Sequence, residues 1–248
     1  MSIPLLGMWV DTTSYAATLE LVIGWAYALE SRYVCVANVH MLMEAFDSTE
    51  YKRIVNSADL VAPDGVPLVW MLRLKGQKDQ QRVYGPTLML HLVRAAARDK
   101  VPVGFYGGAP EVLESLIRRM RARYDALNVA FSSSPPFRVM SPEEDTDMIE
   151  QINQSGARIL FVGLGCPKQE IWMAEHRGKV NAVMLGVGAA FDFHSGIKPQ
   201  APMWMQKAGL EWLFRLFTEP RRLWKRYLYH NPRFIILAVA DLLGLLKD

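Results

Sequence analysis

The sequence has few of the features that mark secreted, membrane-spanning or metal-cluster proteins. Only two cysteines, Cys35 and Cys166, occur in 248 residues, and they stand far apart and outside any CxxC pair. This predicts two reduced thiols, as small core residues, and argues against a disulfide scaffold. The apolar run at 234–246 is interrupted by Asp241 and is shorter than the roughly 20 residues of a membrane-spanning helix. Residues 1–14 lack the basic start of a signal peptide, so we expect a cytoplasmic protein.

The motifs of several common enzyme classes are also missing. No GxxxxGK[ST] loop is present, and the GxG at 163–165 lacks the third glycine of a dinucleotide fingerprint because position 168 is lysine. This counts against a P-loop nucleotidase and a nicotinamide-dependent oxidoreductase. The DxD spacing at 145–147 lies in an acidic segment of helical periodicity, which favours the solvated first turn of a helix over a metal site. We predict neither a metal nor a cofactor.

The remaining pattern is that of an α/β protein. Apolar residues make up 51% of the chain and charged residues 21%, which is enough for a sizeable core. Apolar, β-branched runs alternate with segments of helical periodicity, and the S-P-E-E stretch at 141–144 predicts a capped helix start. This alternation predicts a Rossmann-like, mostly parallel sheet flanked by helices. The expected strands are 33–39, 59–63, 101–107, 127–131, 157–165 and 180–188, and the expected helices are 47–57, 65–75, 85–99, 110–124, 141–154 and 167–177.

The C-terminal segment differs from this pattern. Beyond an α/β core at 1–200, residues 201–248 are aromatic, basic and helical, and we expect a helical appendage that breaks at Pro220 and Pro232. Within 201–233, seven basic residues stand against two acidic ones, a net charge of +5, whereas the whole chain carries only +3. Positive charge is therefore a local property, and it suggests an anionic partner for this segment.

Three kinds of partner, and one alternative that needs no partner, are consistent with the composition of the appendage. Basic and aromatic residues at helical spacing suit an anionic membrane surface or an RNA. Arginines such as Arg215 and Arg222 could instead clamp phosphate groups. In the simplest alternative, the aromatic side chains only complete the core.

Glycines follow the ends of three predicted strands, where the chain leads into a helix. In a doubly wound sheet, ligands bind at this carboxyl edge of the strands. Glycines there can simply allow tight turns, but they also let backbone N–H groups approach a phosphate. Three such exits in one chain favour a nucleotide-type ligand. The candidate ligand-binding residues are Gly107 and Gly108 at the first exit, Gly163, Gly165, Lys168 and Gln169 at the second, and Asp192 at the third.

Asp64 interrupts an apolar run, "ADLVAPDGVPLVW" at 58–70, between a predicted strand and a predicted helix. A carboxylate in such surroundings costs free energy unless it is paired. Asp64 is therefore a turn residue, a helix cap or a catalytic acid/base. Asn38 ends another predicted strand and could line the same site. Arg82 is either a surface charge or a fork for a diphosphate.

Taken in order, these motifs resemble the WecG/TagA/CpsF glycosyltransferase family (glycosyltransferase family 26) over about residues 30–232. The match is specific because of the order and spacing of its parts. They are "ANVHMLMEA" (37–45), "ADLVAPDGVPLVW" (58–70), "RVYGPTLM" (82–89), "FYGGAP" (105–110), "FVGLGCPKQE" (161–170), "GVGAAFDFHSG" (186–196) and "EWLFRLFTEPRRLWKRY" (211–227).

The resemblance implies a function in cell-surface polysaccharide synthesis. The family uses UDP-sugar donors, an acceptor sugar on a polyprenyl diphosphate, and no metal. By analogy, Asp64 matches its proposed general base, and Arg82 and Gln169 match residues implicated in activity. The C-terminal arginines, carried over to Arg215 and Arg222, complete the donor site. The same segment docks on the membrane, which implies a peripheral location on its inner face.

The sequence departs from the family pattern at Val36-Ala37-Asn38, where members that transfer N-acetylmannosamine often have Thr-Pro-Asn. A glucose-type donor therefore stays open beside an N-acetylmannosamine-type donor. The competing hypothesis is a non-enzymatic module that binds RNA or a membrane surface on a nucleotide-binding scaffold, and it gives Asp64 no role. We expect no nucleic-acid partner. The sequence does not decide between a monomer and a homo-oligomer.

Overall fold

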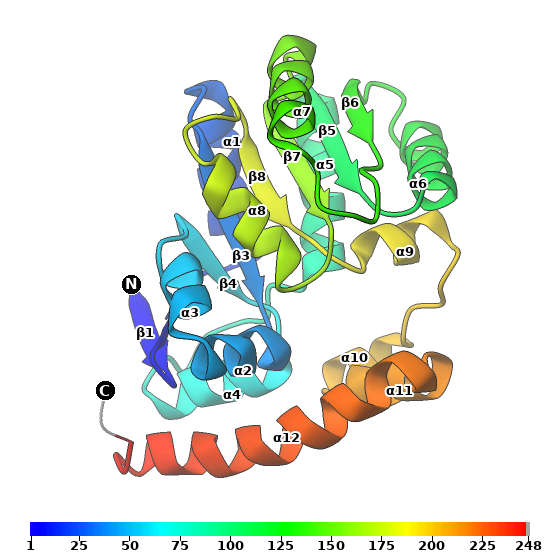
Figure 1. The fold of residues 1–248 in the computed structure, drawn as a ribbon. Coiled ribbons are helices and arrows are strands. Elements are labelled where there is room, and N and C mark those ends of the chain that lie inside the picture. Colours follow the sequence, from blue (N-terminus) through cyan, green and yellow to red (C-terminus); the bar gives the residue numbers. More distant parts are fainter. Residues whose placement is uncertain (247–248) are drawn as a thin grey trace. The chain divides into compact units, whose positions relative to one another are not determined.

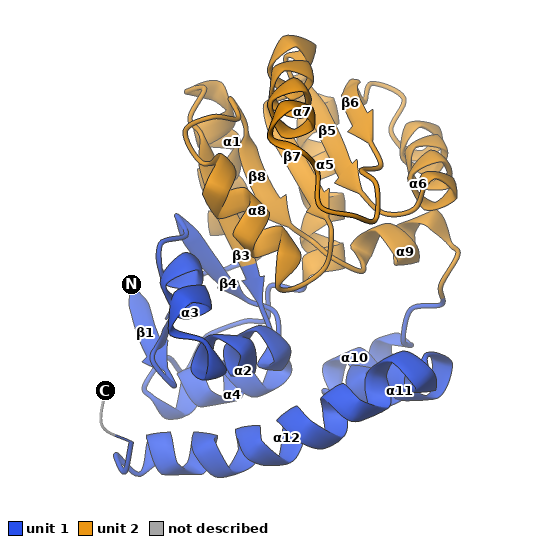
Figure 2. Ribbon diagram, viewed as in Figure 1, with its two compact units in different colours: residues 1–14, 36–84, 199–248 blue, residues 15–35, 85–198 orange. Residues whose placement is uncertain are grey.

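The computed structural model describes residues 1–246, which fall into two compact units (Figure 2). Unit 1 comprises Met1–Ser14, Val36–Tyr84 and the chain from Pro199 on, and unit 2 comprises Tyr15–Cys35 and Gly85–Lys198. Unit 1 therefore joins the C-terminal segment to two stretches from the first third of the chain.

The main sheet has six strands, all parallel, in the order β4-β3-β8-β7-β5-β6 (Figure 1). This confirms the predicted α/β class with a parallel sheet and flanking helices. The inner strands read as continuous apolar runs because both faces of a parallel sheet are covered. The strands are β3 (Arg32–Ala37), β4 (Leu60–Pro63), β5 (Val103–Gly107), β6 (Val129–Ser133), β7 (Ile159–Gly163) and β8 (Val183–Gly186).

Four helices of unit 2, at 85–99, 110–123, 142–155 and 168–176, lie close to the predicted limits, whereas the helices at 15–27 and 190–195 were not predicted. Ser141 caps α7 and forms a capping box with Glu144, as the S-P-E-E stretch predicts, and the helix ends at Gly156 with φ +73°. Both cysteines are free thiols, of which Cys35 is buried and Cys166 is half-buried. The helices are α1 (Tyr15–Tyr27), α5 (Gly85–Asp99), α6 (Pro110–Arg123), α7 (Pro142–Ser155), α8 (Lys168–His176) and α9 (Ala190–Ser195).

Unit 1 contains elements that the sequence pattern did not predict. An antiparallel hairpin of β1 (Ser2–Leu5) and β2 (Met8–Asp11) opens the chain. The helix expected at 47–57 spans Thr49–Asn56. Ser48, which caps it, also ends a separate helix at Val39–Asp47 that the sequence pattern did not predict. The helices of this unit are α2 (Val39–Asp47), α3 (Thr49–Asn56), α4 (Val66–Leu74), α10 (Met203–Lys207), α11 (Glu211–Thr218) and α12 (Pro220–Leu242).

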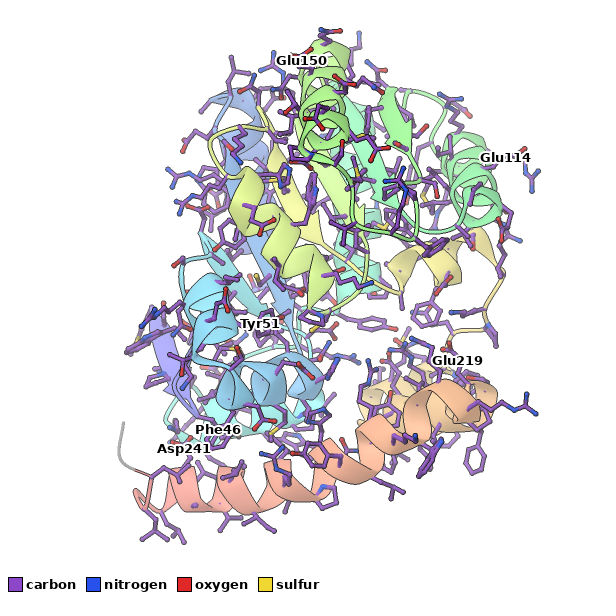
Figure 3. All side chains as sticks on the ribbon, in the orientation of Figure 1. Phe46, Tyr51, Glu114, Glu150, Glu219 and Asp241 are labelled. Atoms are coloured by element: carbon purple, nitrogen blue, oxygen red, sulfur yellow. The ribbon has the colours of Figure 1, made fainter. Side chains whose placement is uncertain are left out.

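The long helix α12 runs beside α2 and α4 (Figure 1). It begins at Pro220, as expected, but it continues through Pro232, so the predicted break there is wrong. Packing outweighs the local cost of an interior proline, because one face of the helix is buried along its length. Asp241 lies near the C-terminal end of α12 (Figure 3). It forms an ion pair of 2.8 Å with Lys75. The buried face of α12 carries Leu223, His230, Phe234 and Ala238.

Candidate active site

Asp64 lies in the short turn between β4 and α4, at the carboxyl ends of two neighbouring strands. The backbone N–H groups of Asp64 and Gly65 both donate to the carbonyl oxygen of Ala37, at 2.8 and 3.0 Å. The N-cap of α4 is Gly65, which makes no side-chain cap hydrogen bond. The helix-cap interpretation of Asp64 is therefore wrong, and its side chain has a different partner.

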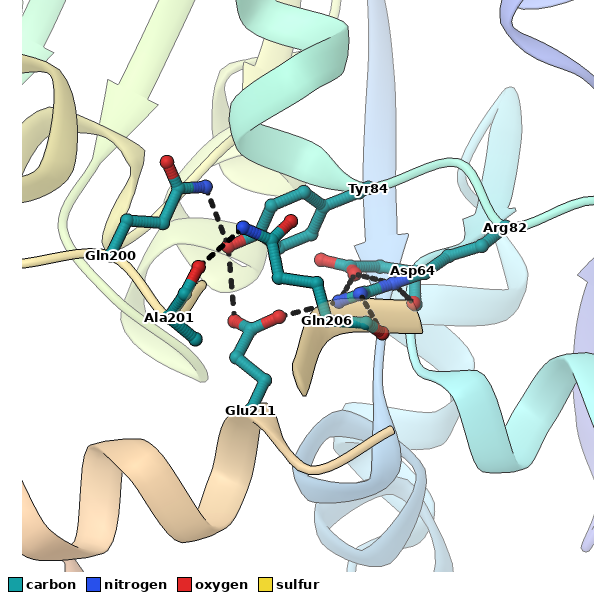
Figure 4. A network of polar contacts seen from close by, with 7 residues as sticks. All are labelled: Asp64, Arg82, Tyr84, Gln200, Ala201, Gln206 and Glu211. Atoms are coloured by element: carbon teal, nitrogen blue, oxygen red, sulfur yellow. Dashed lines mark hydrogen bonds and ion pairs between the residues drawn. The ribbon is translucent and has the colours of Figure 1, made fainter. Parts of the chain in front are cut away.

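That partner is Arg82 (Figure 4). The Arg82 Nη2 lies 2.8 Å from Asp64 Oδ1, and Nε lies 3.1 Å from the same oxygen and also donates to the Asp64 carbonyl. The next residue, Val83, donates its N–H to the Pro63 carbonyl at 2.8 Å, so the segment that carries Arg82 is tied to the end of β4. One guanidinium thus fixes both the backbone and the carboxylate of Asp64.

A second carboxylate, Glu211 at the start of α11, completes the network (Figure 4). Arg82 Nη2 lies 2.9 Å from Glu211 Oε2, and the Tyr84 hydroxyl donates to Oε1 at 3.1 Å. Gln200 in turn donates to the Tyr84 oxygen at 3.0 Å, and the Gln206 carbonyl lies 3.4 Å from Arg82 Nη1. The guanidinium carbon also stands 4.1 Å from the centre of the Tyr84 ring.

The sequence analysis missed Tyr84 and Glu211. Tyr84 follows Arg82 by two residues in a stretch without regular secondary structure, so no periodic pattern places the two side chains together. No local pattern links Glu211 to Arg82, because 129 residues separate them in sequence.

Burial strengthens the electrostatics of this network. The side chains of Asp64, Arg82 and Glu211 are 14%, 21% and 15% exposed. Burial alone would lower the pKa of Arg82, but Asp64 and Glu211 raise it well above its ordinary value, so the guanidinium stays charged. Burial, reinforced by Glu211 and Asp64, raises the pKa of Tyr84 far above its ordinary value, so Tyr84 is a neutral donor. Two carboxylates and one guanidinium give the cluster a net charge of −1 when both carboxylates are ionised.

Asn38 stands next to this turn. It is the N-cap of α2, and its side-chain oxygen accepts the Met41 N–H at 3.2 Å. A Cβ on Gly65 would come within 3.1 Å of the Asn38 Cα, so the two strand exits are closely packed and Gly65 leaves little room for a side chain. Asn38 and Asp64 therefore lie side by side at the carboxyl ends of β3 and β4, as the sequence analysis expected of a shared site.

The glycines of unit 2 allow close packing of neighbouring strand ends. Gly107 has φ +114°, and a Cβ there would come within 2.7 Å of the Gly163 backbone. A Cβ on Gly163 would in turn come within 2.6 Å of the Phe191 ring. The Gly108 N–H donates to the Gly163 carbonyl at 3.2 Å. In contrast, Gly165 has φ +80° and open space around its Cα.

Gln169 ties two of these loops together. Its side chain is buried, and its Oε1 accepts the backbone N–H groups of Gly165 at 3.2 Å and Gly188 at 3.1 Å. Its amide nitrogen donates to Glu170 Oε1 at 2.7 Å. Gln169 is therefore not a solvated helix residue, whereas its neighbour Lys168 is exposed at the start of α8.

The remaining candidates form ion pairs within their own units. In unit 2, Asp192 Oδ2 lies 2.8 Å from Lys198 Nζ. In unit 1, Arg222 contacts Glu219 Oε2 at 2.5 Å through Nη2, and Arg215 Nη2 lies 3.9 Å from Glu219 Oε1. Glu219 is thus the shared ion-pair partner of Arg215 and Arg222, the two arginines that were expected to bind phosphate.

The fold and these residues define a class of protein: an α/β enzyme with ionised side chains at the carboxyl edge of a parallel sheet, where such sheets bind ligands. Residues 3–248 match the family model described as the glycosyl transferase WecG/TagA/CpsF family. The chain belongs to this family of glycosyltransferases of cell-surface polysaccharide synthesis, which confirms the resemblance seen in its motifs. None of the helices within residues 1–246 has the length and hydropathy needed to cross a bilayer.

Proposed function

We propose that the protein transfers a hexose from a UDP-sugar to a sugar on a polyprenyl diphosphate, by a single displacement with inversion, and that Asp64 is the general base. The observation that supports this role most directly is the geometry of Asp64. Its carboxylate stands at a strand end, and Arg82 fixes it in one orientation by a two-point contact. Family membership supplies the reaction class.

The proton has a defined destination in this scheme. The acceptor hydroxyl oxygen forms a bond to C1 of the donor sugar, the bond from C1 to the diphosphate oxygen breaks, and UDP leaves with the electron pair. Asp64 takes the hydroxyl proton. The cluster of Asp64, Arg82 and Glu211 then passes from a net charge of −1 to zero, and Arg82 keeps Glu211 as its counter-ion. The presence of Glu211 thus makes protonation of Asp64 compatible with a permanently charged Arg82.

Arg82 has a positioning role in this scheme. Its Nε and Nη2 contact Asp64 and Glu211, and Nη1 lies near the Gln206 carbonyl. All three guanidinium nitrogens therefore already have partners within the protein. A different pair, Arg215 and Arg222, would neutralise the leaving diphosphate in place of a metal ion. Glu219 holds these two arginines together, and a diphosphate would compete with it for them.

In unit 2, Gln169 sets the shape of the proposed nucleoside-binding loops. By accepting two backbone N–H groups, it fixes the exits after β7 and β8 relative to each other. Gly107, Gly108, Gly163 and Gly165 shape the neighbouring backbone, and Lys168 and Asp192 supply exposed and half-exposed charges beside it. Loops of this kind suit a nucleoside diphosphate.

The C-terminal segment has the surface of a peripheral membrane contact. Many of its large apolar side chains are exposed among basic residues, whereas Phe234 is buried, so the aromatic residues complete the core only in part. Such a face suits the interface of an anionic bilayer, with aromatic rings at headgroup depth. The enzyme would then work on the inner face of the cell membrane, beside its lipid-linked acceptor. The exposed apolar residues are Met203, Trp204, Trp212, Phe217, Trp224, Leu228, Tyr229, Ile235, Ile236, Val239, Leu243 and Leu245.

A UDP-release assay tests the proposed reaction. Purified protein is incubated with UDP-glucose or UDP-N-acetylmannosamine and a short-chain polyprenyl-diphosphate sugar, with and without EDTA. We expect acceptor-dependent UDP release from one of the two donors, and continued turnover in EDTA. No binding of UDP together with salt-dependent RNA affinity would favour the RNA-binding alternative.

A further inference from the structure

Three potential metal ligands meet where α12 packs on α2, in unit 1. His40 and Glu44 stand four residues apart on α2 and therefore share a face of that helix, and His230 faces them from α12. His40 Nδ1 lies 3.6 Å from Glu44 Oε1, and His230 Nε2 lies 3.5 Å from the same oxygen. The three atoms all lie within 4.8 Å of one another.

These two distances fit ligands that share a cation as well as they fit a loose ion pair. A charge-assisted N–H···O⁻ hydrogen bond is shorter, about 2.7–2.9 Å. Two ligand atoms bound to one zinc ion at about 2.0–2.2 Å, at near-tetrahedral angles, lie about 3.3–3.6 Å apart. Both nitrogen-to-oxygen distances fall in the second range. Two imidazoles and one carboxylate are also a ligand set that zinc accepts, with water as the fourth ligand.

The surroundings of His230 favour coordination. The side chain of His230 is only 11% exposed, so the ring is poorly solvated. Its Nε2 faces Glu44, and its Nδ1 has no hydrogen-bond partner within the described residues.

The charges around the site are nearly balanced. Arg233 donates to both carboxylate oxygens of Asp47, at 2.8 and 2.6 Å, so this pair adds little net charge. Glu44 supplies one negative charge to a bound cation. Arg226 stands four residues before His230 on α12, so the two share a face of that helix, and the positive charge of Arg226 opposes a metal ion there.

We propose that His40, Glu44 and His230 bind a zinc-type divalent cation that fixes helix α12 against helix α2. The ion would be structural, because Asp64 and Arg82 belong to a separate network and the ligands lie on a helix–helix contact. It would nevertheless act near the proposed active site. His40 is two residues from Asn38, the N-cap of α2, whose backbone packs against Gly65.

Cobalt binding tests the proposal directly. Full-length protein is stripped with a chelator, dialysed and titrated with Co²⁺. We expect visible d–d absorption typical of a four-coordinate site, saturation at one equivalent, and loss of the absorption when Zn²⁺ is added. Zn²⁺ at 100 times its Kd should raise Tm by about 5–10 °C. Absence of both the absorption and the Tm shift would overturn the proposal. Neither readout depends on the transfer reaction, so the result stands apart from the proposed function.

Variants locate the ion. Glu44→Gln keeps the size of the side chain on a partly exposed position and removes the carboxylate, and we expect Co²⁺ affinity at least about 100-fold weaker, beyond the 10–100-fold cost of losing an outer-shell partner. His230→Ala should weaken Co²⁺ binding to a similar extent. The control is His91→Ala, an exposed histidine on α5, which should bind as the unaltered protein does.

Two results of this series would contradict the assignment. One is unchanged affinity in Glu44→Gln. The other is an equal loss of affinity in His91→Ala, since that would indicate non-specific surface binding. Arg226→Gln adds a test with the opposite sign: removal of its charge should tighten Co²⁺ binding several-fold, and weaker or unchanged binding would count against the position of the ion.

Discussion

Replacement of Asp64 by asparagine removes the proposed proton acceptor and leaves the size of the side chain unchanged. The amide oxygen of the new side chain can still accept a hydrogen bond from Arg82, and Arg82 keeps Glu211 as an ionic partner. The turn is held by backbone hydrogen bonds to Ala37, which the substitution does not touch. The change is therefore directed at proton transfer, with limited effect on the fold.

The expected effect on turnover is much larger than the expected effect on stability. General-base catalysis contributes about 10²–10⁴-fold, so kcat should fall by that factor, which corresponds to roughly 3–5 kcal/mol of transition-state stabilisation. Exchange of a charge-assisted hydrogen bond for a neutral one at a site 14% exposed should cost about 1–2 kcal/mol of unfolding free energy, or about 2–8 °C in Tm. A protein with about 5–15 kcal/mol of stability stays folded after such a loss.

The assay measures kcat from UDP release, Kd for UDP and Tm on the same preparations. Asp79→Asn is the matched control, because Asp79 is an exposed aspartate of the same unit. We expect the control to keep wild-type turnover and Asp64→Asn to keep UDP affinity. Turnover of Asp64→Asn within about threefold of wild type would refute the general-base role. A loss of UDP affinity equal to the loss of kcat would instead assign Asp64 to binding.

Three further predictions concern other parts of the chain. Gln169→Met removes the acceptor of two backbone N–H groups, so it should cost about 2 kcal/mol and about 4–8 °C in Tm, while Gln151→Met on the exposed side of α7 should be nearly neutral. Burial raises the pKa of Tyr106 to about 12 from 10.0, so its contribution to stability is complete below pH 10 and is lost as pH rises towards 12. Tyr106→Phe should therefore lose about 2 kcal/mol less than wild type between pH 9 and 12 in urea unfolding. Loss of the exposed charges of Arg221 and Lys225 on α12 should weaken binding to anionic liposomes about 30-fold, at about 1 kcal/mol for each charge.

Each of these has an outcome that would contradict it. Equal Tm values for the two glutamine variants would show that Gln169 does not hold its loops. An unchanged alkaline slope in Tyr106→Phe would remove Tyr106 as the cause. For liposome binding, the control is the loss of two exposed charges on α6, Arg118 and Arg121. If that control weakens binding as much as Arg221→Gln with Lys225→Gln does, net charge and not the C-terminal segment drives the association.

The sequence was sufficient for the main sheet and most of its helices, because those signals are local. The run at 157–165 contains β7 at 159–163, and helix α5 occupies the predicted 85–99. The capping box at Ser141 forms as expected, because its partners are three residues apart. Motif order was equally informative about the family, since it requires only the linear arrangement of residues.

Local signals failed where packing outweighs propensity. Pro232 predicts a break, but α12 continues through it because one face of the helix is buried against α2 and α4 of the same unit. The predicted strand at 33–39 includes Val39, the first residue of helix α2, because Val39 continues the apolar run of β3. The exposed aromatic residues of the C-terminal segment were also undecided from sequence, since helical periodicity does not say which face is covered.

The linear order of residues was enough to establish the parallel α/β class, the family and the position of Asp64 as an unusual carboxylate among apolar neighbours. The contacts of that carboxylate depend on the folded chain. Arg82 binds Asp64 from 18 residues away, and Glu211 reaches the same guanidinium from 129 residues away. Such pairings leave no periodic trace in a sequence, because they depend on where the chain returns in space. The same reason hid the meeting of His230 with His40 and Glu44.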